Sequence, residues 1–159
     1  MPTIQSIVYM PRNKENYDRN GPFLRLPLDE ARLIANYGLE GDFKAGRDKH
    51  RQLNLIPTDW LAARQAEGYR TGPGEMGEQI ILDGLPMSEM SSGLQLQLGD
   101  EAIIELIKTR TGCDRLDESQ PKPIPAEIKL AGIGYLAKVV QDGTIRVGDP
   151  VTLLIAEMA

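Results

Sequence analysis

The chain contains one cysteine, Cys113, in a segment rich in charged residues, TRTGCDRLDE (109–118). Arg110 precedes it by three residues and Arg115 follows it by two. A nearby arginine lowers the pKa of a thiol from about 8.5 and so raises the share of nucleophilic thiolate. Two aspartates in the same segment would act in the opposite direction. The segment therefore predicts either a reactive or metal-ligating thiolate at Cys113, or a small buried thiol among solvated charges.

A second segment, GLEGDFKAGRDKHRQ (38–52), combines three glycines with basic side chains near its end: Arg47, Lys49, His50 and Arg51. Closely spaced glycines let the backbone approach a ligand, and arginine binds phosphate or carboxylate in bidentate fashion. The segment predicts an anion pocket, with a solvated turn as the alternative. It lacks the Gly-Lys-Ser/Thr ending of a phosphate-binding P-loop. The single histidine and single cysteine make a structural zinc site improbable.

A third segment, PGEMGEQIIL (73–82), places Glu75 and Glu78 on either side of Gly77 before an apolar run. Paired carboxylates can perform acid–base chemistry. Carboxylates at the start of a strand also commonly bind backbone donors or pair with arginine. We expect a structural role for Glu75 and leave the role of Glu78 open.

Composition limits the protein class and its partners. A length of 159 residues predicts a single domain over 1–159, and a lone cysteine excludes an internal disulfide. The net charge of −5 disfavours non-specific binding to nucleic acid. No run of about 18 apolar residues and no secretory leader appear, so we expect a cytoplasmic protein without a membrane span.

The elements that must position these segments are mostly strands. With 16 glycines and 11 prolines, the chain has many turns, and strands do not alternate regularly with helices. We expect a mainly β barrel with two or three helices. The dipeptide Asp142-Gly143 predicts a hairpin between two apolar runs. Expected strands are 3–10, 23–27, 51–56, 78–84, 94–100 and 101–108, and expected helices are 28–38 and 57–69, the latter capped by Thr58 or Asp59.

The order of these motifs resembles the MOSC domain, the C-terminal domain of molybdenum-cofactor sulfurases. The succession is GLEGD with AG and RQ, then GEMGE, then LGD, then an arginine three residues before a cysteine, then AKVVQDGTIRVGDPV. The resemblance covers about residues 38–159. It implies a MOSC-like β-barrel that binds molybdenum cofactor (molybdopterin), or that carries sulfur on its cysteine as a persulfide.

The resemblance also implies roles for individual residues. The family cysteine falls on Cys113, as thiolate ligand of the metal or sulfur carrier, and the preceding arginine on Arg110, which would tune the thiolate. The glycine loop would approach the cofactor closely, and cations would bind its phosphate, with hydrogen bonds to the pterin ring from further side chains. The cofactor-binding candidates are Gly41, Asp42, Arg47, Lys49, Arg51, Gln52 and Glu78.

The chain also departs from the family pattern. Phe43-Lys44 stands where many members have Arg-His, Gln79 where asparagine is usual, and Gly112 where proline is common. We expect no pyridoxal-phosphate domain in this chain, so sulfur or cofactor would come from a sulfur donor or molybdoenzyme partner protein. Enzyme activity stays open, with a sulfur transferase or part of a molybdoenzyme system as the candidates. The alternative function is a non-catalytic anionic small-molecule binding module or adaptor on a degenerate MOSC barrel.

Overall fold

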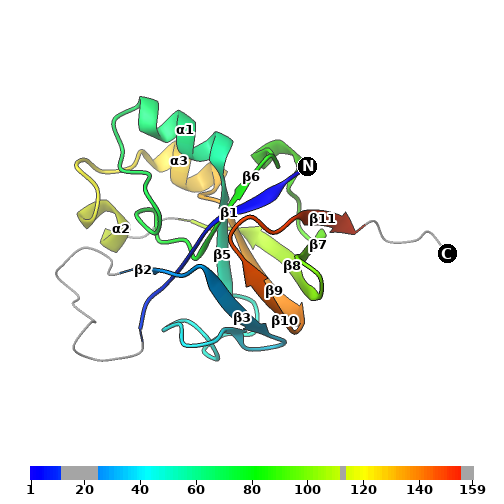
Figure 1. The fold of residues 1–159 in the computed structure, drawn as a ribbon. Helices are drawn as coiled ribbons and strands as arrows, with labels where there is room; N and C mark the ends of the chain where they lie inside the picture. Colours follow the sequence, from blue (N-terminus) through cyan, green and yellow to red (C-terminus); the bar gives the residue numbers. More distant parts are fainter. Residues whose placement is uncertain (12–24, 112–113, 155–159) are drawn as a thin grey trace.

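The computed structural model describes residues 1–11, 25–111 and 114–154, and its strands form two sheets (Figure 1). The larger sheet has eight strands in the order β11-β7-β8-β9-β5-β6-β1-β2, and the smaller has the order β10-β3-β4. The large-sheet strands are β1 (Thr3–Tyr9), β2 (Leu26–Pro27), β5 (Leu53–Pro57), β6 (Ile80–Asp83), β7 (Gln95–Leu98), β8 (Ala102–Thr109), β9 (Tyr135–Gln141) and β11 (Val151–Leu154). The small-sheet strands are β3 (Glu30–Ile34), β4 (Gly38–Leu39) and β10 (Gly143–Arg146).

The large sheet curves until its two ends approach, without closing fully. Backbone hydrogen bonds of 2.7–2.9 Å join residues 2–4 at the start of β1 to residues 148–151 around the start of β11. The contact goes no further than an isolated bridge between Thr3 and Pro150. Proline has no N–H to continue a ladder, and the far end of β1 pairs with β2 instead. The prediction of a mainly β, MOSC-like fold is confirmed, with a sheet that stops short of a closed barrel.

The expected helix at 28–38 is wrong, because this segment contains strand β3. Ala31 and Leu33 are buried, whereas Glu30 and Arg32 are exposed, so burial alternates with the period of a strand. β3 pairs with β10 in an antiparallel register. Apolar residues at helical spacing suggested the helix, but pairing with a distant strand decides the structure.

The expected Asp142-Gly143 hairpin is also wrong. β9 pairs with β5 and β8, whereas β10 pairs with β3 in the other sheet. The chain therefore passes from one sheet to the other at this dipeptide. Asp142 fixes the crossing, because its Oδ1 accepts a hydrogen bond of 2.6 Å from the backbone N–H of Ala35.

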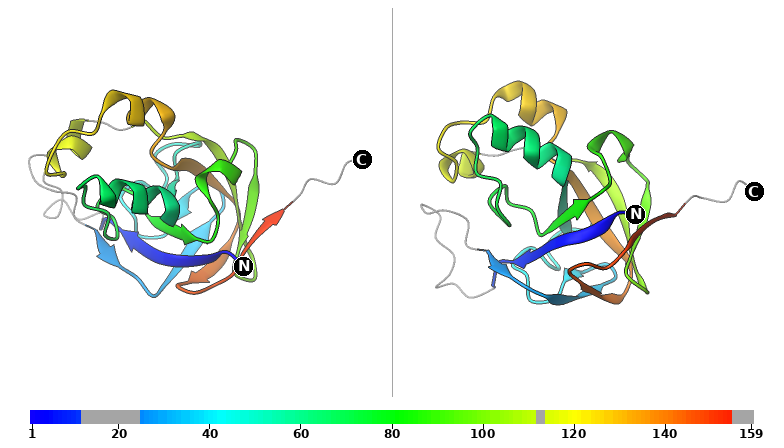
Figure 2. Two further views of the ribbon diagram at one scale, coloured as in Figure 1. Left: turned by 90° about the horizontal axis from the view of Figure 1, so that it is seen from above. Right: turned by 45° about the horizontal axis from the view of Figure 1, so that its top comes forward.

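The helices lie together on one side of the large sheet (Figure 2). They are α1 (Thr58–Ala66), α2 (Asp114–Glu118) and α3 (Ala126–Ala131), and a 3-10 turn, η2 (Met87–Glu89), follows β6. The helix over 57–69 is confirmed as α1, which connects the parallel strands β5 and β6. Its predicted cap is wrong: Pro57 is the N-cap residue, no side chain caps the helix, and Thr58 donates to Asp83 instead.

Two apolar clusters hold these layers. The larger lies among the strands of both sheets, and the smaller joins the helices to β5 and β6 through residues such as Ile56, Leu61 and Leu116. Asp117 fixes α2 to α3, because its carboxylate binds Lys129 Nζ at 2.5 Å and the Ile124 N–H at 3.0 Å. Burial raises the pKa of Asp117, but the bonds from Lys129 and Ile124 outweigh it and lower the pKa.

The strand assignment of β3 predicts which side chains support the core. Leu33→Ala should lower the free energy of unfolding by about 2–5 kcal/mol, because it removes a fully buried side chain. Arg32→Ala is the matched control, with an expected change below about 1 kcal/mol, since its ion pair with Asp142 is exposed. Denaturant unfolding of both variants measures the difference, and equal losses would contradict the strand.

Candidate functional site

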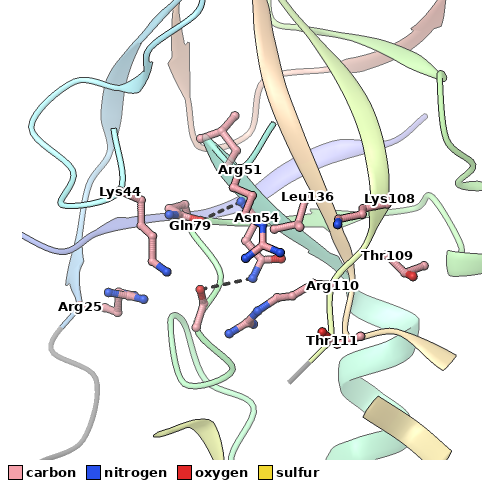
Figure 3. Close-up of a pocket in the computed structure, with 12 residues that line it drawn as sticks. Arg25, Lys44, Arg51, Asn54, Gln79, Lys108, Thr109, Arg110, Thr111 and Leu136 are labelled. Atoms are coloured by element: carbon pink, nitrogen blue, oxygen red, sulfur yellow. Dashed lines mark hydrogen bonds between the residues drawn. The ribbon is translucent and has the colours of Figure 1, made fainter. Parts of the chain in front are cut away.

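One cavity, of about 520 Å³, opens between the large sheet and the segments that connect its strands (Figure 3). Such a volume lies within the range of about 300–1,000 Å³ that is usual for small-molecule sites. Its lining residues are Arg25, Lys44, Arg51, Leu53, Asn54, Gly77, Gln79, Lys108, Thr109, Arg110, Thr111 and Leu136.

Strands supply the floor of the cavity. Leu53 and Asn54 belong to β5, Leu136 to the adjacent β9, and Lys108 and Thr109 to the end of β8. These three strands are neighbours in the large sheet, so their backbones hold the floor rigidly. Leu136 lies opposite Asn54 on the same face of the sheet and is half-buried, so its side chain gives the floor an apolar surface against which a flat ring can pack.

Connecting segments supply the walls and most of the charge. Arg25 comes just before β2, Lys44 from the turn after β4, and Arg51 from the segment before β5. Together with Lys108 and Arg110, they make five cationic side chains around the cavity, and no carboxylate is among its described lining residues. The pocket is thus strongly positive in a chain whose net charge is −5, and it favours an anionic ligand.

Two of these arginines pack closely against glycines of the PGEMG turn (residues 73–77). A Cβ on Gly77, which has a φ of +82°, would lie 2.7 Å from Arg110 Nη2, and a Cβ on Gly74, with a φ of +79°, would lie 2.5 Å from Arg25 Cγ. Both positions require glycine for its backbone conformation and for the approach of the arginine. Arg110 Nη1 also donates to the carbonyl oxygen of Met76. This turn therefore fixes Arg110 through the Met76 carbonyl oxygen and leaves room for Arg25 at Gly74.

Asp42 supports the pocket from behind. Its fully buried carboxylate accepts hydrogen bonds from the N–H groups of Met10, at 2.9 Å, and Lys44, at 3.1 Å, and from Gln79 Nε2, at 3.1 Å. Gln79 in turn accepts a bond of 2.8 Å from the N–H of Asn54. Lys44, Gln79 and Asn54 all line the cavity, so one carboxylate fixes three parts of its wall.

Glu78 lies fully buried beneath the PGEMG turn and outside the cavity lining. Its carboxylate accepts hydrogen bonds from the N–H of Gly74 and, at 3.2 Å, from that of Met76. Burial raises the pKa of Glu78 to about 7, against the lowering effect of these backbone bonds and of Arg25. Its hydrogen bonds to backbone N–H groups of the turn give Glu78 a structural role. Binding of a pterin ring by Glu78, which the sequence suggests, stays a prediction.

Two of the site residues predicted from the sequence, Arg51 and Arg110, lie together in the structure, because both line the cavity. Cys113 lies outside the described residues. The remaining candidates are not among the lining residues: Gly41, Asp42, Arg47, Lys49, Gln52 and Glu78. Their roles in cofactor binding stay predictions.

Two of those candidates make local contacts. Arg47 Nε donates to the carbonyl oxygen of Phe43 at 2.7 Å, and its guanidinium lies 3.9 Å from the centre of the Phe43 ring. Gln52 Oε1 accepts a bond of 2.8 Å from the Val139 N–H, which ties the segment before β5 to β9. Both side chains therefore have contacts that stabilise the fold.

Sequence reasoning missed several lining residues. Lys44 stands out in the sequence only as a departure from the family pattern, and Arg25 belongs to none of the motifs. Lys108 directly precedes the cysteine segment (109–118), but nothing in its type or spacing marks it as a site residue. For Asn54 the sequence predicts only a place in the strand 51–56. Among the described residues, no group of three or more histidine, cysteine, aspartate or glutamate side chains could hold a metal ion. No helix in the described ranges is long and apolar enough to cross a bilayer.

Comparison with known families agrees with the order of the motifs. The family model of the MOSC domain matches residues 40–152. The chain belongs to the MOSC domain family. This family is associated with molybdenum-cofactor sulfurases and with proteins that bind molybdenum cofactor.

Individual relatives support the same fold. YiiM from Geobacillus stearothermophilus is similar with a TM-score of 0.74 and 19% identity, covering 98% of this chain and 76% of that one. YiiM from Escherichia coli has a TM-score of 0.64 and 24% identity, covering 98% and 70%. A protein named Reductase from Gibberella moniliformis is 26% identical over 98 residues, which are 60% of this chain and only 18% of that protein. At these identities the structural likeness shows the MOSC fold alone.

The buried Glu78 predicts a measurable dependence of stability on pH. Its folded pKa of about 7 lies above the ordinary 4.5, so between these values the folded state binds the proton and the unfolded state does not. The free energy of unfolding should therefore fall as pH rises from 4.5 to 7, by up to about 3 kcal/mol from this group. Glu78→Gln should flatten that part of the curve, relative to an exposed control, Glu40→Gln. Parallel curves for the wild type and Glu78→Gln would contradict the prediction.

Proposed function

We propose that this MOSC domain binds molybdenum cofactor, or a closely related pterin phosphate, in the cationic cavity. One observation carries the proposal. Five cationic side chains line a cavity of about 520 Å³ in a chain of this family, and none of the described lining residues has a carboxylate. Hydrogen bonds from charged donors to an anion are each worth about 1.5–3 kcal/mol, so several of them favour a phosphate strongly.

The lining residues fit such a ligand beyond their charge. Leu136 offers an apolar surface to a ring, and the buried amide of Asn54 offers a polar group in the same cavity. Arg51 and Arg110 would bind the phosphate, together with the other cations of the wall. When bound, the cofactor supplies molybdenum–sulfur redox chemistry, and the residues of this chain orient it and neutralise its charge.

The sulfur chemistry of the proposal rests on Cys113. It follows Thr111, the last lining residue of its segment, by two positions in the sequence. As a carrier, its thiolate attacks the outer sulfur of a persulfide on a donor protein; the donor's S–S bond breaks, the donor leaves as a thiolate, and Cys113 becomes the persulfide. Alternatively the thiolate ligates molybdenum, which binds soft sulfur ligands. Either role requires a reduced thiol, so we place the protein in the cytoplasm with a sulfur donor or molybdoenzyme as partner.

A second candidate is a non-catalytic module that holds an anionic small molecule. The cavity itself favours it, because no histidine or carboxylate for proton transfer is among the described lining residues. Under this function Cys113 contributes nothing to ligand affinity, whereas under the first it is needed for metal ligation or sulfur transfer.

Anion binding is testable with pyrophosphate and isothermal titration calorimetry. Arg51→Ala and Arg110→Ala should each weaken binding by about ten-fold or more, because each removes a charged donor from the cavity. The same variants should reduce the loss of affinity on adding salt. Arg32→Ala is the matched control, since Arg32 is an exposed arginine outside the lining. Equal effects of all three substitutions would count against the cavity as the binding site.

Sulfur transfer is testable by intact mass after incubation with a persulfide donor. We expect the wild type to gain the mass of one sulfur atom, about 32 Da, and Cys113→Ser to gain none. Molybdenum content after incubation with the cofactor then tests ligation. If Cys113→Ser keeps full cofactor affinity and metal content and the wild type gains no sulfur, the non-catalytic module is the better description.

A further inference from the structure

The amide of Asn54 is a buried polar group with an unused acceptor. Asn54 is 6% exposed and lines the cavity, and its Oδ1 accepts no hydrogen bond from any residue that the structure describes. Buried amide oxygens in folded proteins are almost always hydrogen-bonded, so one without a donor, in a residue that lines a cavity, suggests that a ligand or water supplies the missing donor. In Figure 3 this amide lies in the middle of the lining, between the side chains of Arg51 and Arg110.

The orientation of this amide is fixed by its surroundings. Asn54 Nδ2 points at the carbonyl oxygen of Gly77, at 3.5 Å, and a flipped amide would instead set two oxygens against each other. Gln79 holds the backbone of Asn54 through two hydrogen bonds. The side-chain Oε1 of Gln79 accepts from the Asn54 N–H at 2.8 Å, and the backbone N–H of Gln79 donates to the Asn54 carbonyl oxygen at 3.0 Å. The buried carboxylate of Asp42 anchors Gln79 in turn. The free oxygen is therefore a preorganised acceptor.

An acceptor among cations discriminates between parts of a ligand. An ionised phosphate group has only acceptor oxygens, so the arginines and lysines bind it and Asn54 Oδ1 does not. A neutral N–H of a heterocycle is the complementary partner, and an analogue without that N–H leaves the buried oxygen unpaired. Leu136, which pairs with Asn54 across β5 and β9, provides the apolar surface beside which such a ring would lie.

We propose that Asn54 is the specificity-determining residue of this pocket, and that it selects phosphate-bearing ligands whose planar ring presents an N–H donor. This inference rests on the proposed anion site and adds the ring chemistry to it. Pterins and guanine both carry such an amide-type N–H. Asn54 would therefore recognise the edge of the ring that bears this N–H.

The test compares three probes that share a phosphate and a flat ring. Phenyl phosphate has no N–H, whereas guanosine 5′-monophosphate and 6-hydroxymethylpterin monophosphate both have one. Asn54→Leu should weaken binding of the N–H-bearing probes by about ten-fold, which corresponds to about 1.4 kcal/mol, and that of phenyl phosphate by less than about two-fold. A loss confined to the pterin or to the nucleotide identifies which ring the pocket accepts.

Two controls separate specificity from folding. Gln141→Leu removes an exposed amide from β9 and should leave all three affinities unchanged. Ligand-free Asn54→Leu should melt at or above the wild-type temperature, because a buried oxygen without a donor is removed; if this variant does not fold, Asn54→Ala replaces it.

The outcomes distinguish this inference from the function on which it rests. If phenyl phosphate and pyrophosphate bind but the N–H-bearing probes bind no better, or if Asn54→Leu weakens all probes equally, the role of Asn54 is overturned and the anion site stands. If no phosphate-bearing probe binds the wild type, the anion site itself is overturned, and the role of Asn54 with it.

Discussion

The buried carboxylate of Asp42 is the interaction on which the pocket depends. It joins the end of β1, the turn after β4 and the start of β6 through Met10, Lys44 and Gln79. A buried carboxylate that loses such donors carries a large desolvation cost, so the three segments are held together strongly. The sequence predicts a ligand-binding role for this aspartate of the GLEGD motif. In the structure its carboxylate lies outside the cavity lining and holds segments of the cavity wall in position.

The second constraint is electrostatic. Cationic side chains around one cavity repel each other, and the fold holds them there with backbone and glycine contacts, as at Arg110 against Gly77 and the Met76 carbonyl oxygen. Functional sites commonly contain local interactions that lower the stability of the protein, and favourable interactions elsewhere in the fold offset them. An anionic ligand relieves the repulsion, so ligand binding and pocket stability are coupled.

Much of the fold was predictable because many strands alternate visibly. The segment LQLQL became β7, and the helix after Pro57 became α1. β3 was not predictable, since its strand form depends on pairing with β10 more than a hundred residues later. The site was likewise predictable only in part. Arg51 and Arg110 belong to recognisable motifs, so the sequence identifies them as candidates. Asn54 belongs to no motif, and only the cavity above β5 and the contacts with Gln79 reveal it as a site residue.

We infer that the cavity above β5, β8 and β9 is a preformed site for a phosphate-bearing ligand. A crystal structure of the protein grown with pyrophosphate tests it most directly. We expect the anion inside the cavity, within hydrogen-bond distance of Arg51 and Arg110, with the surrounding backbone unchanged. An empty cavity at saturating pyrophosphate, or an anion bound only at exposed cations such as Arg47 and Lys49, would contradict it.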